Sequence, residues 1–186
     1  MKTIFDDGAG AVLKSKNLPM NPHFCGALLG ELEALPYIYE FGRDVSWVGN
    51  KDLNYRYSHK DHTTCGWGAT PILQRFSEEK VRALLQSPDR GRYLNHVLVN
   101  RYGPQHSINK HKDDEPELAG PLASLSLGAS AEFTFSRAYN GSKTHHITLE
   151  DGDLMIGSRK FFDNYYHAVS KPNGDYRLNL TWRTVR

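Results

Sequence analysis

Two histidines and one aspartate have the types and spacing of a metal site. In His111-Lys112-Asp113, an extended strand would project residues two apart to the same side, so we expect His111 and Asp113 to reach one ion together. His167, in NYYHAV, is the third candidate ligand. Two neutral imidazoles and one carboxylate leave positions open for a chelating cosubstrate and dioxygen, which is typical of non-haem Fe(II) sites. Taken singly, either histidine fits a core or surface role better, so the prediction depends on all three.

The C-terminal stretch RLNLTWR predicts an anion-binding strand. Its polar residues alternate and share one face, namely Arg177, Asn179, Thr181 and Arg183. Such a row is costly inside a sandwich unless it meets an anion, and a dicarboxylate such as 2-oxoglutarate would suit the planar guanidiniums. Asn100 and Tyr102 in VNRY alternate in the same way on a second strand and could complete the pocket. The alternative is the solvated side of an edge strand.

The elements that must position these residues are mostly strands. From Tyr93 onward, short β-prone segments alternate with turn signals. They are Leu94–Tyr102, Leu122–Leu127, Glu132–Phe135, His145–Leu149, Asp153–Ile156, Tyr165–Val169 and Tyr176–Thr184. Many short strands without intervening helices predict a β-sandwich or jelly roll.

Two helices are predicted before these strands. The first begins at Asn21-Pro22, a cap followed by a first-turn proline, and ends at Pro36. The second begins at Pro71, with Thr70 as its cap, and ends near Ser87. We expect both to pack against one face of the sheets. The fold class is therefore α+β, mainly β, in a single domain over residues 1–186.

The segment from Phe41 to Trp67 differs from the rest because it lacks a long apolar period. It predicts irregular hairpins or loops over a surface rather than core. Its basic and aromatic residues interleave, as phosphate contacts beside stacking faces would. They are Lys51, Arg56, His59, Lys60 and His62 with Trp47, Tyr55, Tyr57 and Trp67. Four more cations could extend this track, namely Lys110, Lys112, Arg159 and Lys160. The alternative is a solubilising loop whose aromatic residues anchor it to the core.

Bulk composition sets wider limits on function. Of 186 residues, 39% are hydrophobic and 24% charged, and the net charge of +2 is too small to indicate a polyanionic partner by itself. Cys25 and Cys65 occur without a CxxC pattern, which argues against a disulfide framework or a zinc site. No run is long enough for a membrane helix or resembles a signal peptide. We expect an intracellular monomer, cytoplasmic or nuclear, without a membrane partner.

Several motifs occur in fixed order between Leu94 and Arg183, namely VLVNRY, HKDDE, PLASLSLG, GDLMIG, YYHAV and RLNLTWR. Together they resemble the AlkB family of nucleic-acid dealkylases, above all the DNA-repair homologues of animals and plants. The resemblance implies a double-stranded β-helix, which is a jelly roll, with N-terminal helices and a nucleotide-recognition lid. The lid would span about residues 41–67 and the catalytic jelly roll residues 93–186.

The resemblance also implies roles for individual residues. His111, Asp113 and His167 would bind iron and form the catalytic centre. Arg177 would bind the distal carboxylate of 2-oxoglutarate. The rest of that cosubstrate would be held by Arg183, Asn179, Asn100 and Tyr102. Thr181 shares the face of Asn179 and Arg183 and is expected to line the same pocket.

On the substrate side, Glu115 would contact the exocyclic amine of the damaged base. In LNYRYSH, Tyr57 would stack on the flipped base and Tyr55 would be an accessory contact. Further contacts are expected from Trp67, Arg56 and Lys112.

The implied activity is oxidative dealkylation of bases such as 1-methyladenine and 3-methylcytosine in DNA or RNA. It would convert 2-oxoglutarate and O2 into succinate and CO2 and release an aldehyde. Because a stacked base cannot reach the iron, it must be flipped or single-stranded. Two alternatives stay open: a 2-oxoglutarate oxygenase that hydroxylates a protein or small molecule, and a non-catalytic jelly-roll binding module.

Overall fold

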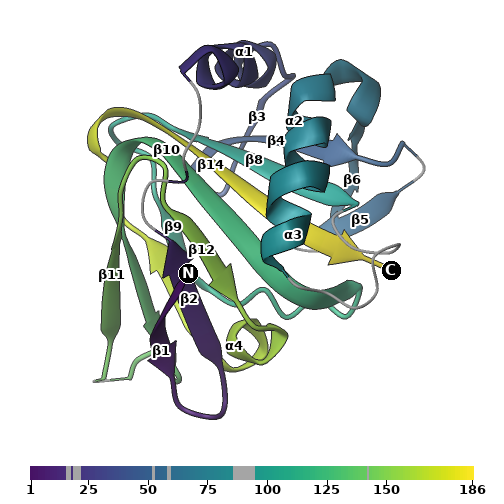
Figure 1. Ribbon diagram of the computed structural model, residues 1–186. Helices are drawn as coiled ribbons and strands as arrows, with labels where there is room; N and C mark the ends of the chain where they lie inside the picture. Colours follow the sequence, from purple (N-terminus) through teal and green to yellow (C-terminus); the bar gives the residue numbers. More distant parts are fainter. Residues whose placement is uncertain (16–17, 19–21, 52, 58–59, 86–94, 142) are drawn as a thin grey trace.

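Two antiparallel sheets face each other, and helices cover the outer face of the larger one (Figure 1). The computed structural model describes residues 1–15, 18, 22–51, 53–57, 60–85, 95–141 and 143–186. This arrangement is the jelly roll that the sequence predicts. Within the described residues, no helix is both long and apolar enough to cross a membrane.

The larger sheet has the strand order β1-β2-β12-β10-β14-β8-β4-β3. Its strands are β1 (Lys2–Asp6), β2 (Ala11–Ser15), β12 (Leu154–Gly157), β10 (Leu118–Ser136), β14 (Asn173–Val185), β8 (His96–Tyr102), β4 (Arg43–Gly49) and β3 (Ile38–Glu40). The short β7 (Cys65–Gly66) pairs in parallel with β4. Of the predicted strand Leu94–Tyr102, Leu94 lies outside the described residues.

The second sheet consists of β9 (Ile108–His111), β13 (Tyr166–Val169), the C-terminal part of β10 and β11 (His145–Leu149). Strand β10 therefore runs through both sheets, where the sequence predicts two separate strands. It changes sheets at an irregularity beside Gly128, whose φ of +82° favours glycine. A Cβ there would lie 2.8 Å from the Tyr176 carbonyl oxygen. The chain bends at this point without needing a turn.

The predicted helices are present and pack on the outer face of the larger sheet. They are α1 (Pro22–Glu33), α2 (Pro71–Phe76) and α3 (Arg82–Leu84), with a π-helical segment η2 (Ser77–Val81) between the last two and a 3-10 turn η1 (Trp67–Ala69) before α2. Their apolar residues share one core cluster with the Leu178, Leu180 and Trp182 face of β14. The alternation predicted for β14 is thus confirmed. The expected positions of the first cap at Asn21 and of the helix end near Ser87 lie outside the described residues.

The start of α2 differs from the prediction in one respect. Thr70 occupies the cap position, but its side chain makes no capping hydrogen bond. The Glu31 carboxylate instead accepts hydrogen bonds from the backbone N–H groups of Ile72 and Leu73, at 2.8–3.0 Å. A carboxylate from α1 therefore satisfies the helix start and ties the two helices together.

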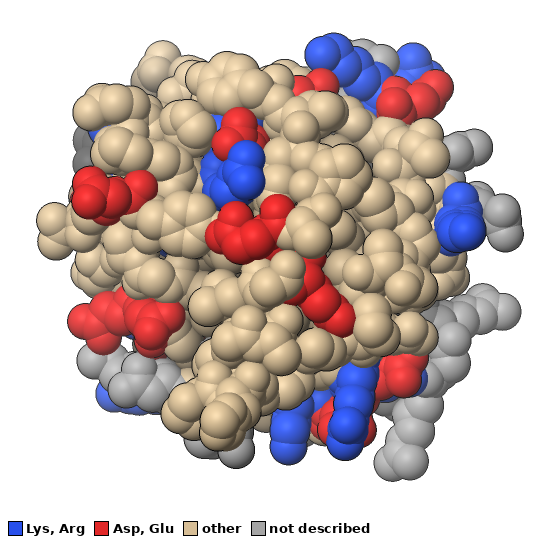
Figure 2. All heavy atoms as spheres, turned by 90° about the horizontal axis from the view of Figure 1, so that it is seen from above, with Lys and Arg blue, Asp and Glu red and all other residues tan. Residues whose placement is uncertain are grey.

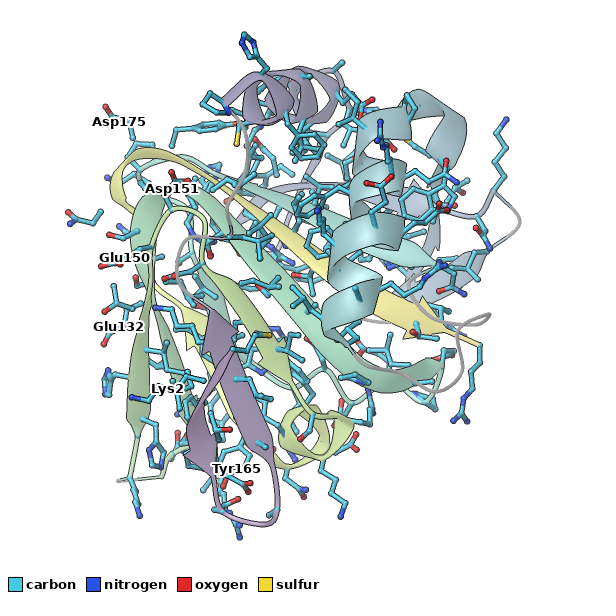
Figure 3. All side chains as sticks on the ribbon, viewed as in Figure 1. Lys2, Glu132, Glu150, Asp151, Tyr165 and Asp175 are labelled. Carbon is cyan, nitrogen blue, oxygen red and sulfur yellow. The ribbon has the colours of Figure 1, made fainter. Side chains whose placement is uncertain are left out.

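An N-terminal hairpin and a short helix were not predicted. Strands β1 and β2 form a hairpin at one edge of the larger sheet. Asp7 in its turn accepts hydrogen bonds from Arg137, at 2.6 Å, and from the hydroxyl of Tyr165, which is labelled at the lower part of this hairpin in Figure 3. Helix α4 (Arg159–Asn164) lies between β12 and β13, and Ser158 caps it by accepting from the Phe161 N–H.

The expectation of an irregular surface segment from Phe41 is wrong for residues 43–49. These residues form β4, which pairs with β8 in the larger sheet. Val45 and Trp47 are buried against Leu98 of β8, so β4 belongs to the core. Residues further along form a separate hairpin, β5 (Asn54–Tyr57) and β6 (Lys60–Thr63), as expected.

Candidate metal centre

Strand register brings the two histidines face to face. His111 at the end of β9 lies directly opposite His167 of β13, and their ring centroids are 4.2 Å apart. The alternation predicted Asp113 on the same strand as His111. That prediction is wrong, because β9 ends at His111. The loop that follows nevertheless turns the Asp113 carboxylate inward. Its oxygens lie 3.8 Å from His111 Nε2 and 3.7 Å from His167 Nε2.

The three side chains fit a single metal ion. One ligand atom from each lies within 4.8 Å of the others, which suits coordination bonds of about 2 Å to a central ion. The Asn109 carbonyl accepts a hydrogen bond from His111 Nδ1 at 2.8 Å, which leaves the lone pair on Nε2 toward Asp113. Two imidazoles and one carboxylate are the donor set that Fe(II) oxygenases use.

The protonation states favour metal binding as well. Burial lowers the pKa of His111 and, together with the nearby His111 ring, lowers the pKa of His167 to about 3. Burial alone would raise the pKa of Asp113, but Arg183 and the two histidines lower it to about 2. The Arg183 guanidinium donates to Asp113 Oδ1 at 3.2 Å. Neutral imidazoles and an ionised carboxylate are the forms that ligate a metal.

Helix α4 holds the loop that carries Asp113. Arg159 at its start donates to the Asp113 carbonyl at 3.1 Å and to the Glu115 carbonyl at 3.4 Å. Its guanidinium also pairs with Asp163 at 2.6 Å. Arg159, which the sequence suggested as a phosphate contact, is thus engaged in fixing the metal-binding loop.

A pocket extends from the metal site between the two sheets. All six residues predicted to hold the cosubstrate line it, namely Asn100, Tyr102, Arg177, Asn179, Thr181 and Arg183. They meet because β8 and β14 pair with Asn100 opposite Asn179 and Tyr102 opposite Arg177. His111 and His167 line the same pocket, so two of the predicted metal ligands share one cavity with the residues predicted to hold the cosubstrate.

Hydrogen bonds fix the polar wall of this pocket. Asn179 Oδ1 accepts from Asn100 at 3.3 Å and from Thr181 at 3.0 Å. Asn179 also donates to the Ser124 hydroxyl at 2.7 Å. These side chains are therefore held in place before any ligand binds.

Arg177 shows that the pocket suits an anion. Its side chain is buried, one nitrogen donates to Ser126 at 2.9 Å, and the guanidinium lies 5.0 Å from the Tyr102 ring centre. Among the described residues, its Nε and Nη1 have no hydrogen-bond partner. A buried cation with unused donors and no carboxylate is costly. The carboxylate of 2-oxoglutarate would satisfy those donors, so the residues present fit this cosubstrate.

Two expected substrate contacts lie beside the metal loop. Glu115 is half-buried, and its Oε2 has no hydrogen-bond partner among the described residues. Burial raises the pKa of Glu115 to about 7, although Arg183 acts in the opposite direction. Lys112 places its ammonium 4.7 Å from the Tyr166 ring centre.

The remaining expected contacts are less closely gathered. Arg56 is exposed on the β5–β6 hairpin, 4.0 Å from Asp61. The side chains of Tyr55 and Tyr57, and all of His59, lie outside the described part of the chain. Trp67 packs against the core under the helices and donates to Asn50 at 3.0 Å. It is not among the described residues that line the pocket.

Two residues assigned to the aromatic and basic surface are buried instead. Trp47 and His62 stack with ring centroids 4.3 Å apart, and both are at least 93% buried. They are not surface contacts, because the stack joins the β5–β6 hairpin to β4.

Arg43 is a pocket residue that the sequence reasoning missed. It begins β4, is buried and lines the same cavity. In RDVSWVG, Arg43 alternates with Val45 and Trp47 on one face of the strand. That period of two indicates a strand, although the polar and turn-forming residues around it favour a loop.

Comparisons with known proteins agree with this site. A family profile described as the 2OG-Fe(II) oxygenase superfamily matches residues 23–183. The Alpha-ketoglutarate-dependent dioxygenase AlkB of Salmonella typhimurium is 35% identical over 96 residues, which are 46% of this chain and 43% of that protein. The DNA oxidative demethylase ALKBH2 of Mus musculus is 30% identical over 176 residues, which are 88% of this chain and 70% of the relative.

A solved structure shows the same fold. The structure of OsALKBH1 superposes with a TM-score of 0.64 at 19% identity, covering 93% of this chain and 97% of that one. The chain spans less than half of the Salmonella relative but most of the mouse one. Because the profile covers residues 23–183 and the mouse relative is 30% identical over 70% of its own length, the chain belongs to the 2OG-Fe(II) oxygenase superfamily and, within it, to the AlkB family of dioxygenases.

Proposed function

We propose that this chain removes alkyl groups oxidatively from nucleic-acid bases such as 1-methyladenine and 3-methylcytosine. The observation that carries the proposal is the shared cavity, in which His111, Asp113 and His167 meet an arginine-lined pocket. The assignment to nucleic acids is supported by the mouse relative, a DNA oxidative demethylase. Whether DNA or RNA is preferred is decided by the experiment below.

The pocket residues would bind and orient the cosubstrate. Arg177 offers two unused donors to a carboxylate, and Asn100 and Asn179 form a fixed polar wall beside it. Bound Fe(II), 2-oxoglutarate and O2 would supply the oxidation of the alkyl carbon, after which the hydroxylated group leaves as an aldehyde. The apolar residues that line the rest of the pocket, including Phe133 and Phe162, exclude water from the reacting atoms.

The substrate base would enter beside the metal-binding loop. Glu115, with a buried carboxylate oxygen that lacks a partner among the described residues, can accept a hydrogen bond from an exocyclic amine. Tyr57 on β5 is proposed as the stacking platform and Tyr55 as an accessory contact. A base inside a duplex must be flipped to reach this position.

The phosphate backbone of the substrate would follow the β5–β6 hairpin. Its phosphates would contact Arg56 and Lys60 of the hairpin and Lys112 of the metal-binding loop. On the face seen in Figure 2, acidic and basic groups are interspersed over a largely uncharged surface. That face does not resemble a phosphate track, which needs gathered positive charge. The proposal places the nucleic acid on the hairpin and the metal-binding loop because Arg56, Lys60 and Lys112 lie there.

The proposal is tested with Fe(II), 2-oxoglutarate and a panel of methylated oligomers, single- and double-stranded, of DNA and RNA. We expect methylated oligomers to stimulate succinate formation and to lose the mass of one CH2 unit, because hydrogen replaces the methyl group that leaves as formaldehyde. The unmethylated oligomers are the matched control. Stimulation by peptides or small molecules, with every oligomer unchanged, would overturn the nucleic-acid assignment and favour another oxygenase substrate.

The proposal includes an intracellular location and a monomeric chain. A reducing interior would keep iron in the Fe(II) state and leave Cys25 and Cys65 as the free thiols they are in the structure. Light scattering of the purified chain tests the monomer, and a dimer mass would contradict it.

A further inference from the structure

Arg43 is a buried cation that forms no ion pair with a carboxylate of the described residues. Its side chain is 1% exposed. Its three hydrogen-bond acceptors are neutral: Asn100 Oδ1 at 2.8 Å, and the carbonyls of Phe41 at 3.3 Å and Glu40 at 3.4 Å. Among the described residues, no carboxylate forms an ion pair with it. A charged guanidinium in this setting indicates that an anion belongs nearby.

The cavity that Arg43 lines has an unusual charge balance. Three guanidiniums face it, those of Arg43, Arg177 and Arg183, and no Asp or Glu is among its described lining residues. Arg183 has a carboxylate partner in Asp113 at 3.2 Å. In the described part of the chain, Arg43 and Arg177 have no ion-paired carboxylate. A ligand with two negative charges would match them.

We propose that Arg43 is a third cosubstrate-binding arginine, which acts with Arg177 on the 2-oxoglutarate dianion. This inference rests on the proposed use of 2-oxoglutarate. Arg177 reaches the pocket from β14, whereas Arg43 reaches it from β4, with β8 between them. The two cations therefore approach the pocket from different strands, and Asn100 on β8 links Arg43 to Asn179 of β14 by hydrogen bonds.

Arg43 is also tied to the turn between β3 and β4. It holds the carbonyls of Glu40 and Phe41, and Phe41 has a φ of +49°, which is uncommon for a residue other than glycine. These bonds fix the guanidinium from its outer side while Asn100 fixes it from the inner side. Its position is thereby set before the ligand binds, which reduces the entropy lost on binding.

The test measures binding rather than turnover. The Fe(II)-loaded chain is titrated with 2-oxoglutarate by calorimetry under anaerobic conditions, so that no reaction occurs. Arg43→Gln should raise the Kd for 2-oxoglutarate at least about tenfold, because truncating a buried charged partner typically costs more than 1.4 kcal/mol. Arg43→Lys keeps the charge but loses the planar fork, and should give a smaller rise of about threefold or more.

Arg101→Gln is the matched control. Arg101 follows Asn100 on β8, points to the other side of the sheet and pairs with Asp44 at 3.1 Å. Arg101→Gln removes the same unit of charge from a neighbouring position that does not face the pocket. Its Kd for 2-oxoglutarate should therefore stay within about twofold of the wild type. Direct Fe(II) titration of each variant shows whether metal affinity is unchanged.

The outcomes separate this inference from the proposed function. A folded Arg43→Gln chain with wild-type affinity for 2-oxoglutarate would overturn the role of Arg43. If Arg43→Gln does not fold, the folded Arg43→Lys chain decides, and wild-type affinity there would overturn it too. A wild-type chain that binds 2-oxoglutarate yet leaves methylated oligomers unchanged would contradict the proposed function and leave the Arg43 result standing.

Discussion

The arginine-lined cavity and the β5–β6 hairpin are built in different ways. In the cavity, the register of β8 with β14 places Asn100 and Tyr102 opposite Asn179 and Arg177, and that of β9 with β13 places the two histidines opposite each other. Side-chain hydrogen bonds then hold the polar wall in place. The hairpin forms a two-stranded sheet of its own. Two of its side-chain contacts with the larger sheet are the Lys60 to Glu40 ion pair at 3.1 Å and the stack of His62 on Trp47.

The difference teaches that turnover and substrate recognition depend on separate parts of the fold. Sheet hydrogen bonding must break before the cavity residues can separate. The hairpin can shift when a few side-chain contacts change, as elements with few contacts generally can. Changes in the cavity should therefore stop all turnover, whereas changes in the hairpin should affect only the choice and use of substrate.

The largest effect should follow from Asp113→Ala. It removes a metal ligand and leaves the Arg183 guanidinium without its carboxylate. Loss of a residue that only hydrogen-bonds a metal ligand lowers metal affinity or activity about 10–100-fold. We therefore expect loss of the ligand itself to lower succinate formation by more than that, with and without oligomer. Substantial residual turnover would show that Asp113 is not a ligand. Asp114→Ala, at the adjacent position, is the control.

Arg177→Gln should have the next largest effect, again with or without oligomer. It removes the donors that face the pocket, and loss of one partner of a buried charge pair costs about 2–5 kcal/mol. The KM for 2-oxoglutarate should rise about thirtyfold or more. An unchanged KM would mean that the cosubstrate binds elsewhere.

Tyr57→Ala should distinguish the two regions most clearly. Base stacking on an aromatic side chain is worth about 1–3 kcal/mol, so kcat/KM for a methylated oligomer should fall about fivefold to a hundredfold. Succinate formation without oligomer should stay close to the wild type. Tyr57→Phe keeps the ring and should retain activity. Equal losses in both assays would contradict a role confined to substrate.

The smallest effect should come from Arg56→Gln on the exposed surface of the hairpin. One phosphate contact contributes about one unit to the slope of log affinity against log salt concentration. Oligomer affinity should therefore weaken a few-fold at low salt, and the slope should become shallower by about one. A slope identical to that of the wild type would place the backbone away from this residue.

The sequence predicted the cavity better than the hairpin for physical reasons. On β14, a period of two separates Arg177 and Asn179 from Leu178 and Leu180, and burial on both faces leaves one possible register. The strand expected to carry Asp113 ends at His111, yet its carboxylate still lies beside the two histidines, because a loop can present the same carboxylate from a different backbone. Arg43 was missed because polar and aromatic neighbours concealed a buried strand.

Tertiary contacts decided the features that the sequence did not indicate. The helix cap comes from Glu31, far along the chain from Thr70, and no local pattern reveals it. Similarly, the N-terminal hairpin pairs with β12 and its turn residue Asp7 meets Arg137 and Tyr165, all far along the chain. Such partners become visible only when the sheets are assembled.

The central claim is that three side chains distant in sequence hold one ferrous ion beside an arginine-lined pocket. Its most direct test is anaerobic titration of the purified chain with Fe(II) and then with 2-oxoglutarate, followed by visible absorption. The wild type should bind one equivalent of each and develop a charge-transfer band on adding 2-oxoglutarate, and His167→Ala should not. Formation of the same band by the His167→Ala chain would contradict the claim.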